Sequence, residues 1–359
     1  MGIVRKTCHS LLKYDVHLSA IALILSMLAA SIIIILSGYS PIEAYGAMID
    51  GAFVGTTHIA TTLGVATPLI FSGLAMVISS KAGVFNIGAE GQIIIGAVVA
   101  ALLGHYISGL PVVLHILICI VGASVAGGFW AWIAGVLKTR KGINEVIVTI
   151  MLNYVAFYFV EYLISHPFKA EGMTTRTETV MDSAVIPSVI AHTRLNYGII
   201  LALLAAVLLW IFLNRTLAGY ELRSVGLNPH AAEGAGIHAN RKIEFAMLLS
   251  GMIAGLGGAI EVMGVQGYYI TNMTANYGYN GIAVAVMGQY SPIGTIFSAL
   301  IFGALKAGSS NMNRLTDIPS EFIVILQALI IIFVSTPGLI RTFEKKIKEI
   351  LHSISKRRG

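Results

Sequence analysis

Long apolar runs separated by shorter polar stretches dominate this chain between residues 18 and 340. A helix needs about 17–25 mostly apolar residues to cross the hydrocarbon core of a bilayer, and most of the runs reach that length. The pattern predicts an all-α integral membrane protein, a polytopic bundle of about ten transmembrane helices, with eight or nine full crossings as the alternative. The expected spans are residues 18–37, 57–80, 92–108, 111–137, 145–165, 197–213, 243–264, 278–290, 293–311 and 321–340.

The run 278–290 is too short to cross alone, so we expect some helices to be broken or re-entrant. Its surroundings, "NYGYNGIAVAVMGQYSPIGTIFSALIFG", echo the earlier "GVFNIGAEGQIIIGAVVAALLG", because both place Gly and Asn directly before a helix rich in small residues. Interrupted hydrophobic segments at matching positions of two halves are typical of transporters built from inverted repeats. The predicted fold therefore includes a possible inverted repeat, with chance similarity among 38 glycines as the competing explanation.

Composition also indicates a membrane protein. Only 11% of the 359 residues are charged and the mean hydropathy is +0.83, whereas an ordinary soluble domain has about 25% charged residues. The net charge of +6 does not indicate a nucleic-acid partner, because the basic residues lie at the ends of apolar runs. Cys8 and Cys119 have no spacing typical of a disulfide framework or a zinc site, so no metal is expected.

The distribution of lysine and arginine predicts the orientation, because cytoplasmic loops are enriched in both. These residues are concentrated in 1–17, 138–141, 214–242 and 341–359, and they are missing from 38–58 and 265–280. We therefore expect a multi-pass membrane protein with both termini in the cytoplasm. Residues 166–196 would form an external loop, in which three basic residues are balanced by three acidic ones.

Polar side chains inside the spans are the candidates for contact with a solute, because a charge at the bilayer centre costs about 2.5–3.5 kcal/mol and needs a partner or a wet cavity. Glu90 has two interpretations: it lines such a cavity, or it braces the start of its own helix, expected to begin near Gln92, where the dipole favours negative charge. Glu261 and Lys306 either pair across the bundle, or Lys306 extends to the membrane surface. The substrate-path candidates are Asn86, Glu90, Gln92, Asn153, Glu261, Gln266, Tyr277 and Asn280.

Tyrosines and asparagines are concentrated in "GVQGYYITNMTANYGYNGIAVAVMG", residues 264–288. Aromatic faces and carboxamides suit stacking and hydrogen bonding to a flat or sugar-like solute. The alternative is a belt of tyrosines at the membrane interface. The residues concerned are Tyr268, Tyr269, Tyr277, Tyr279, Asn272, Asn276 and Asn280.

The cytoplasmic loop 214–242 contains "GLNPHAAEGAGIHANRK", which predicts a short helix. Asn228 suits the N-cap, Pro229 suits the first turn, and Gly234 or Gly236 can supply a left-handed C-cap. So short a helix is marginal alone. We expect it to pack on its own bundle or to dock on another protein, with an ordinary connecting turn as the alternative.

Motifs of nucleotide hydrolysis and of common enzymes are missing from the sequence. No segment has the G-x-x-x-x-G-K-[ST] spacing that cradles phosphates, and H-E-x-x-H and G-x-S-x-G do not occur. We therefore expect no catalytic residue, no bound cofactor and no enzymatic activity. A transporter of this kind would use ATP hydrolysed by a separate subunit.

Five ordered blocks resemble the permease subunits of bacterial ABC importers for branched-chain amino acids, ribose and nucleosides, and most of all the nucleoside (simple-sugar-type) branch. These blocks are "FNIGAEGQ", "GINEVIVTIMLNY", "GYELRSVGLNPHAAEGAGI", "LSGMIAGLGGAIEVMGVQG" and "YGYNGIAVAVMG". The resemblance implies three kinds of partner: cytoplasmic ATP-binding subunits, a second permease subunit in a homo- or heterodimer, and an extracytoplasmic substrate-binding protein. It makes residues 18–340 the transmembrane permease domain, between a cytoplasmic N-terminus (1–17) and a basic cytoplasmic tail (341–359).

The same resemblance implies that the short cytoplasmic helix is the segment that contacts the ATPase: Asn228, Pro229, His230, Ala231, Ala232, Glu233, Gly234, Ala235 and Gly236. The expected function is an alternating-access pathway for a neutral polar solute such as a nucleoside, because the spans hold few fixed cations for an anionic solute. The alternatives are a sugar or branched-chain amino acid ABC permease, and an ion-coupled secondary transporter that uses Glu90 or Glu261.

Overall fold

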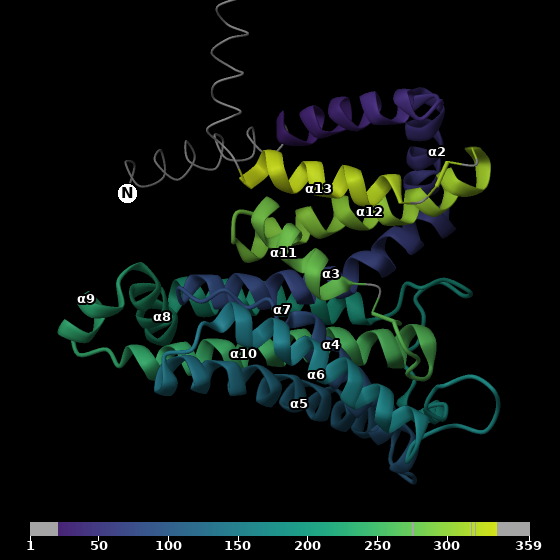
Figure 1. The fold of residues 1–359 in the computed structure, drawn as a ribbon. Coiled ribbons are helices and arrows are strands. Elements are labelled where there is room, and N and C mark those ends of the chain that lie inside the picture. Colours follow the sequence, from purple (N-terminus) through teal and green to yellow (C-terminus); the bar gives the residue numbers. More distant parts are fainter. Residues whose placement is uncertain (1–20, 275, 317, 320, 336–359) are drawn as a thin grey trace, which may run out of the picture. The chain divides into compact units, whose positions relative to one another are not determined.

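The computed structural model describes residues 21–274, 276–316, 318–319 and 321–335, and within these ranges the chain is helical and has no β-sheet (Figure 1). The expected terminal segments, 1–17 and 341–359, lie outside the described residues, as does Cys8. The helices are Ile21–Leu36, α2 (Pro41–Phe53), α3 (Thr56–Lys81), α4 (Ala89–Tyr106), α5 (Val112–Lys141), α6 (Glu145–Ser165), η1 (Asp182–Ala184), α7 (Gly198–Arg215), α8 (Leu217–Leu227), α9 (Pro229–Gly234), α10 (Ala239–Glu261), the π-helical η2 (Val262–Gln266), α11 (Tyr277–Met287), α12 (Pro292–Thr316) and α13 (Phe322–Ser335).

Seven of the described helices are long and apolar enough to cross a membrane: α3, α4, α5, α6, α7, α10 together with η2, and α12. Two shorter apolar helices, Ile21–Leu36 and Phe322–Phe333, lie where the first and last spans were expected. The predicted class, an all-α polytopic membrane protein, is confirmed. The short eighth span is α11, whose 11 residues reach about 17 Å at 1.5 Å per residue, roughly half of a hydrocarbon core of about 30 Å.

The chain divides into two compact units, which we describe separately. The larger unit, Ala52–Ala307, contains α3 to α11 and most of α12. The smaller unit combines Met1–Gly51 with Gly308–Gly359. In it, the Asn311 side chain at the end of α12 donates a hydrogen bond of 2.9 Å to the carbonyl of Ala47 in α2.

Glycines allow the central helices of the larger unit to pack backbone against backbone. A Cβ at Gly127 in α5 would collide with Gly251 and Gly255 in α10, and one at Gly96 in α4 would collide with Gly255. Small residues at such contacts are the usual basis of close helix packing in membranes. The "GMIAG" motif at 251–255 is therefore a contact surface, as its spacing predicts.

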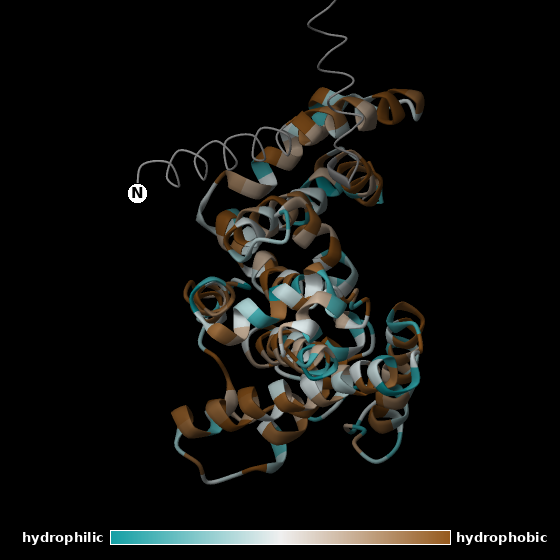
Figure 2. Cartoon of the chain, turned by 90° about the vertical axis from the view of Figure 1, so that its left-hand side faces the viewer, coloured by the Kyte–Doolittle hydropathy of each residue, from teal (hydrophilic) through white to brown (hydrophobic). Residues whose placement is uncertain are grey.

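The helices of the larger unit differ in burial. The apolar part of α3 is 89% buried, whereas that of α7 is 28% buried and those of α5 and α6 are 33% buried. Figure 2 shows helices at the lower edge of the view that are apolar (brown) along much of their length, whereas helices in the middle of the view mix apolar and polar residues. The exposed apolar faces of α5, α6 and α7 therefore require either lipid or another subunit as their surroundings.

Two helices of the larger unit begin inside the bundle rather than at its ends. The Asn86 side chain, just before α4, donates to Ser250 in the middle of α10 at 2.8 Å, and Ser250 donates to the carbonyl of Ala75 in α3 at 2.6 Å. The start of α11 lies close to the start of α4, because a Cβ at Gly278 would collide with the backbone of Glu90. The N-terminal ends of α4 and α11 therefore meet among the other helices.

Two connecting segments lie at opposite ends of the larger unit: α8 and α9 at one end and residues 166–196 at the other (Figure 1). The helix predicted at 228–236 is α9, and the side chain of Asn228 caps it by accepting from the Ala231 amide at 3.1 Å. The 166–196 segment is tied to the far ends of α4 and α10, since the Met181 and Ile186 amides donate to the carbonyls of Gly104 and Met263, each at 2.8 Å.

Candidate functional site

A cavity of about 320 Å³ lies where the starts of α4 and α11 meet. Ligand pockets usually measure about 300–1,000 Å³, so this one is large enough for a small solute. Its walls come from α4, α6, α11 and the segment 267–276, and they combine aromatic rings with carboxamides. The lining residues are Glu90, Ile94, Asn153, Tyr154, Phe157, Tyr158, Asn272, Thr274, Asn276 and Tyr279.

Glu90 is the carboxylate of the cavity lining, and both of its oxygens are engaged. Oε1 accepts a short hydrogen bond from the Thr274 hydroxyl, and Oε2 accepts from the Gly278 amide at 2.7 Å. The carboxylate thus lies at the N-terminus of α11, where unpaired amides and the helix dipole favour negative charge. Glu90 thus lines the cavity, and the helix start that it braces is that of α11 rather than that of its own helix, α4, as the sequence suggested.

Asn153 in α6 holds the start of α4. Its Oδ1 accepts from the Gly91 amide at 2.8 Å, and its Nδ2 donates to the Ile87 carbonyl at 3.0 Å and to the Tyr279 hydroxyl at 3.2 Å. The carboxamide therefore joins α6, the turn before α4 and α11. It also fixes the ring of Tyr279 at the cavity wall.

Asn86 and Gln92 form a buried amide pair at the start of α4. Each side chain donates to the carbonyl oxygen of the other at 3.1 Å, and the Gly88 amide donates to the Asn86 side chain at 2.9 Å. The pair satisfies polar groups that the break before α4 leaves inside the bundle, where unpaired groups are costly. These two amides shape the interrupted helix and do not line the cavity.

Glu261, the last residue of α10, is buried and forms an ion pair with Arg194 of the 166–196 segment at 2.5 Å. Burial lowers the pKa of the Arg194 guanidinium, but the charge of Glu261, the Tyr277 side chain and the hydrogen bond to Glu261 together raise that pKa above its ordinary value. The Nζ of Lys306 lies 4.3 Å from the centre of the Tyr277 ring and within electrostatic range of Glu261 and Glu90. Two carboxylates and two cations thus balance one another in this part of the unit.

Residues 58–335 match the family described as the branched-chain amino acid transport system permease component. The chain belongs to this permease family. Among its relatives, the guanosine ABC transporter permease protein NupP of Bacillus subtilis is 38% identical, over 92% of this chain and 95% of NupP. The nucleoside ABC transporter permease protein NupB of Lactococcus lactis is 33% identical, over 94% of this chain and 96% of NupB. A glucose ABC transporter permease protein of Haloferax volcanii is 30% identical, over 89% and 88%.

The permease brings only part of the predicted substrate-path residues to the cavity. Glu90 and Asn153 line it. Tyr277 is only 2% exposed and belongs to the core, while Gln266 and Asn280 are half-buried and lie outside the lining. The partner of Glu261 is Arg194, a residue that the sequence suggested only as one charge of a loop.

The cavity also contains residues that the sequence analysis did not choose as substrate-path candidates. Asn272, Asn276 and Tyr279 belong to the tyrosine and asparagine cluster at 264–288. The sequence therefore indicates that they suit a flat or sugar-like solute, but it does not indicate that they line this cavity. The α6 residues Tyr154 and Tyr158 were missed, although their i, i+4 spacing puts both on one face of a helix.

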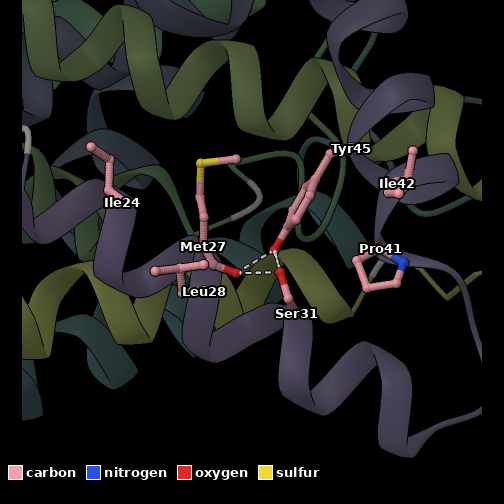
Figure 3. Close-up of a pocket in the computed structure, with 7 residues that line it drawn as sticks. All are labelled: Ile24, Met27, Leu28, Ser31, Pro41, Ile42 and Tyr45. Atoms are coloured by element: carbon pink, nitrogen blue, oxygen red, sulfur yellow. Dashed lines mark hydrogen bonds between the residues drawn. The ribbon is translucent and has the colours of Figure 1, made fainter.

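A second cavity of the permease, of about 360 Å³ in the smaller unit, offers no comparable site (Figure 3). It is lined mainly by apolar side chains such as Ile24, Leu28 and Ile42. Its hydroxyl groups are already used, since Tyr45 and Ser31 each donate to the carbonyl of Met27 at 2.7 Å. A polar solute would find little to bind there.

Proposed function

We propose that this permease forms the alternating-access pathway of an ABC importer for nucleosides. The observation that carries the proposal is the state of Glu90 in the cavity. Its carboxylate already occupies the N-terminus of α11, where an anionic group of a solute would otherwise bind. A neutral solute fits this cavity better than an amino acid carboxylate or a nucleotide phosphate does.

The relatives support a nucleoside as that neutral solute. Two of the three that we describe are named for guanosine or nucleosides, and they cover more than nine-tenths of this chain. A sugar remains the alternative, since the third is named for glucose. A branched-chain amino acid fits less well because of its carboxylate.

The proposal includes the partners and the placement of an ABC importer. ATP is hydrolysed by cytoplasmic ATP-binding subunits, which contact residues 228–236. A second permease subunit and an extracytoplasmic substrate-binding protein complete the complex. The chain crosses the bacterial cell membrane about ten times with both termini in the cytoplasm, and the interrupted helices α4 and α11 support an inverted repeat.

The ion-coupled alternative would require Glu90 or Glu261 to take up and release a proton during transport. Glu90 is engaged by Thr274 and Gly278, and Glu261 is paired with Arg194. Protonation of either carboxylate would weaken these contacts, which favours a structural role for both. Purified permease alone should therefore show no uptake in liposomes under a pH gradient.

A competition assay tests the proposal. Cells that express the complete transporter take up radiolabelled inosine in the presence of excess uridine, ribose, leucine or inosine monophosphate. We expect uridine to compete and the other three to leave uptake unchanged. Residues 228–236, which would contact the ATPase, are called the coupling segment. The variant Glu233→Arg in this segment should abolish uptake while the protein stays in the membrane. Competition by leucine alone would overturn the choice of substrate.

A further inference from the structure

Resting on the proposed nucleoside function, we infer that the permease recognises the base of its substrate, through Asn272, Asn276 and the rings of Tyr154 and Tyr158. These four residues come from two elements, the segment 267–276 and α6, and all of them line the cavity. The ribose then occupies the remaining space.

Asn272 and Asn276 are held in the same unusual conformation on either side of Thr274. Both have φ near +62°, in the left-handed region, and both side chains are exposed. Asparagine tolerates this conformation in ordinary turns, so the backbone alone does not indicate a site. Both residues also line the cavity, and no hydrogen bond joins either carboxamide to another residue of the described part of the chain.

Carboxamides suit the edge of a base. Each one carries a donor and an acceptor side by side, and a base edge presents the complementary pattern, which asparagine and glutamine bind with two hydrogen bonds. Ribose hydroxyls are donors that a carboxylate would accept well, but both oxygens of Glu90 are already used. The free polar groups of the cavity therefore match a base better than a sugar.

The aromatic side of the cavity suits the flat face of a base. Tyr154 and Tyr158 lie one turn apart on α6, and these residues remain 57% and 64% exposed. Stacking of a base on an aromatic ring contributes about 1–3 kcal/mol and tolerates different bases. Stacking from α6 and hydrogen bonding from 267–276 would therefore hold a base from two directions.

Glu90 is a positioning residue in this arrangement. Its carboxylate holds Thr274, which lies midway between the two asparagines, and it also holds Gly278 at the start of α11. The loop is thus fixed from inside the bundle, while its two carboxamides remain available at the cavity. The solute contacts the asparagines, and Glu90 acts on the solute through them.

The test uses the complete transporter with an unchanged binding protein, so that any change in uptake arises in the permease. Asn272 and Asn276 are replaced together by glycine, because glycine adopts a φ of +62° without strain. Tyr158→Phe keeps the ring and Tyr158→Ala removes it. The matched control is His192→Gly, a left-handed residue with φ of +60° that lies outside the cavity.

We expect the double glycine variant and Tyr158→Ala to lower the maximal rate of inosine uptake at least tenfold. Tyr158→Phe should regain most of the rate lost in Tyr158→Ala, because it restores the ring, and His192→Gly, which lies outside the cavity, should stay within twofold of the wild type. A thermal-shift assay on the purified complex without binding protein measures ligand binding directly, since a ligand that binds the native state raises the unfolding temperature. Inosine and hypoxanthine should raise it for the wild type and not for the double variant, and ribose should not raise it for either.

The outcomes separate this inference from the proposed function. Unaltered inosine uptake by the double glycine variant would overturn base recognition and leave nucleoside transport standing. A thermal shift with ribose but not with hypoxanthine would overturn it as well. Wild-type uptake of glucose or ribose with no uptake of inosine would overturn the proposed function, and the inference with it.

Discussion

Glu90 is a buried carboxylate that organises the candidate site through its hydrogen bonds. It is only 6% exposed, and a charge at such a position is costly unless hydrogen bonds satisfy it. The Thr274 hydroxyl and the Gly278 amide supply those bonds, and both belong to the neighbouring interrupted helix and its loop. The cost of burying the charge is thus offset by the contact that joins α4 to α11.

A double-mutant cycle should show that Glu90 and Thr274 act through one contact. Glu90→Gln leaves one acceptor oxygen and turns an NH2 group toward a donor, while Thr274→Val removes a hydroxyl donor. Hydrogen bonds to charged groups are worth about 1.5–3 kcal/mol, so each single change should lower the rate of inosine uptake about tenfold. The double variant should be no slower than the slower single variant, because the groups share one interaction.

Initial uptake rates, normalised to the amount of permease in the membrane, provide the measurement for this cycle. A loss in the double variant equal to the product of the two single losses, about a hundredfold, would mean that the residues act independently. In that case Glu90 would have a role beyond holding Thr274.

Arg194 and Glu261 should behave as a buried ion pair, in which the Arg194 side chain is the more exposed of the two. The side chains are 39% and 3% exposed, respectively. Removing one partner of a buried pair costs about 3–5 kcal/mol because the other charge is left unpaired, whereas replacing both by apolar residues is often neutral. Arg194→Met should therefore lower the unfolding temperature of the purified permease more than the double change Arg194→Met with Glu261→Met.

Thermal unfolding in detergent, followed with a thiol-reactive dye that detects the buried Cys119, gives this comparison. The exposed replacement Lys169→Met, in the same segment, serves as the control and should cause a much smaller shift. If the double variant unfolds below Arg194→Met, the pair does not behave as a coupled unit.

Individual site residues differed in how well the sequence could predict them. Glu90 and Asn153 stand out because a polar group inside an apolar run needs a partner, which is a local signal. Tyr154 and Tyr158 do not stand out, because tyrosine is common at membrane interfaces. The partner of Glu261 lies 67 residues away in sequence, and only the folded chain brings the two together.

At the scale of elements, α8 is connected to the candidate site through the turn that precedes α4. A Cβ at Gly226 in α8 would collide with the Lys81 carbonyl and the Gly83 amide. Gly83 has φ of +75°, which glycine adopts without strain. α8 therefore contacts this turn directly, and residues 84–88 join the turn to the start of α4.

Gly226→Ala should therefore uncouple transport from ATP hydrolysis. The added methyl group would push α8 away from residues 81–83, and the movement of the coupling segment would no longer reach α4. In proteoliposomes with the complete transporter, we expect ATP hydrolysis to persist while inosine uptake falls more than tenfold. Gly46→Ala is the matched control, because a Cβ there meets nothing within 4 Å. Normal uptake by Gly226→Ala would contradict this route.

Elements were predicted from the sequence with uneven success, for physical reasons. The long spans follow from length and hydropathy, and α9 follows from its capping residues. The helix α8 was not predicted, because its 11 residues are short and mixed in polarity. The meeting of α4 and α11 was suggested by the Gly and Asn pattern before each, but their contact depends on packing that no local pattern records.

At the scale of the whole molecule, the exposed faces of α6 and α7 indicate different surroundings. The exposed large side chains of α7 are Ile200, Leu203, Leu204, Val207, Leu208, Trp210 and Ile211. Tyr197, the residue before this helix, is exposed as well. Along most of its length this face is aliphatic and suits lipid. The exposed face of α6 includes Tyr154, Tyr158 and Tyr162, and the first two open onto a cavity with exposed carboxamides. Lipid would leave these polar groups without partners at the depth where α4 and α11 begin.

We therefore expect the second permease subunit of the proposed transporter to cover the α6 face. Met151 lies on this face and is 55% exposed, and Leu204 lies on the α7 face and is 50% exposed, so they form a matched pair. Each is replaced by cysteine in a Cys8→Ser background and labelled with a maleimide that carries a benzophenone. Illumination of native membranes should join Met151→Cys to a protein of permease size, because a neighbouring chain lies within reach. Leu204→Cys should give no protein adduct, because its neighbours are lipids. Adducts from Leu204→Cys alone would place the partner against α7 and leave the cavity facing lipid, which is incompatible with a polar solute path along α6.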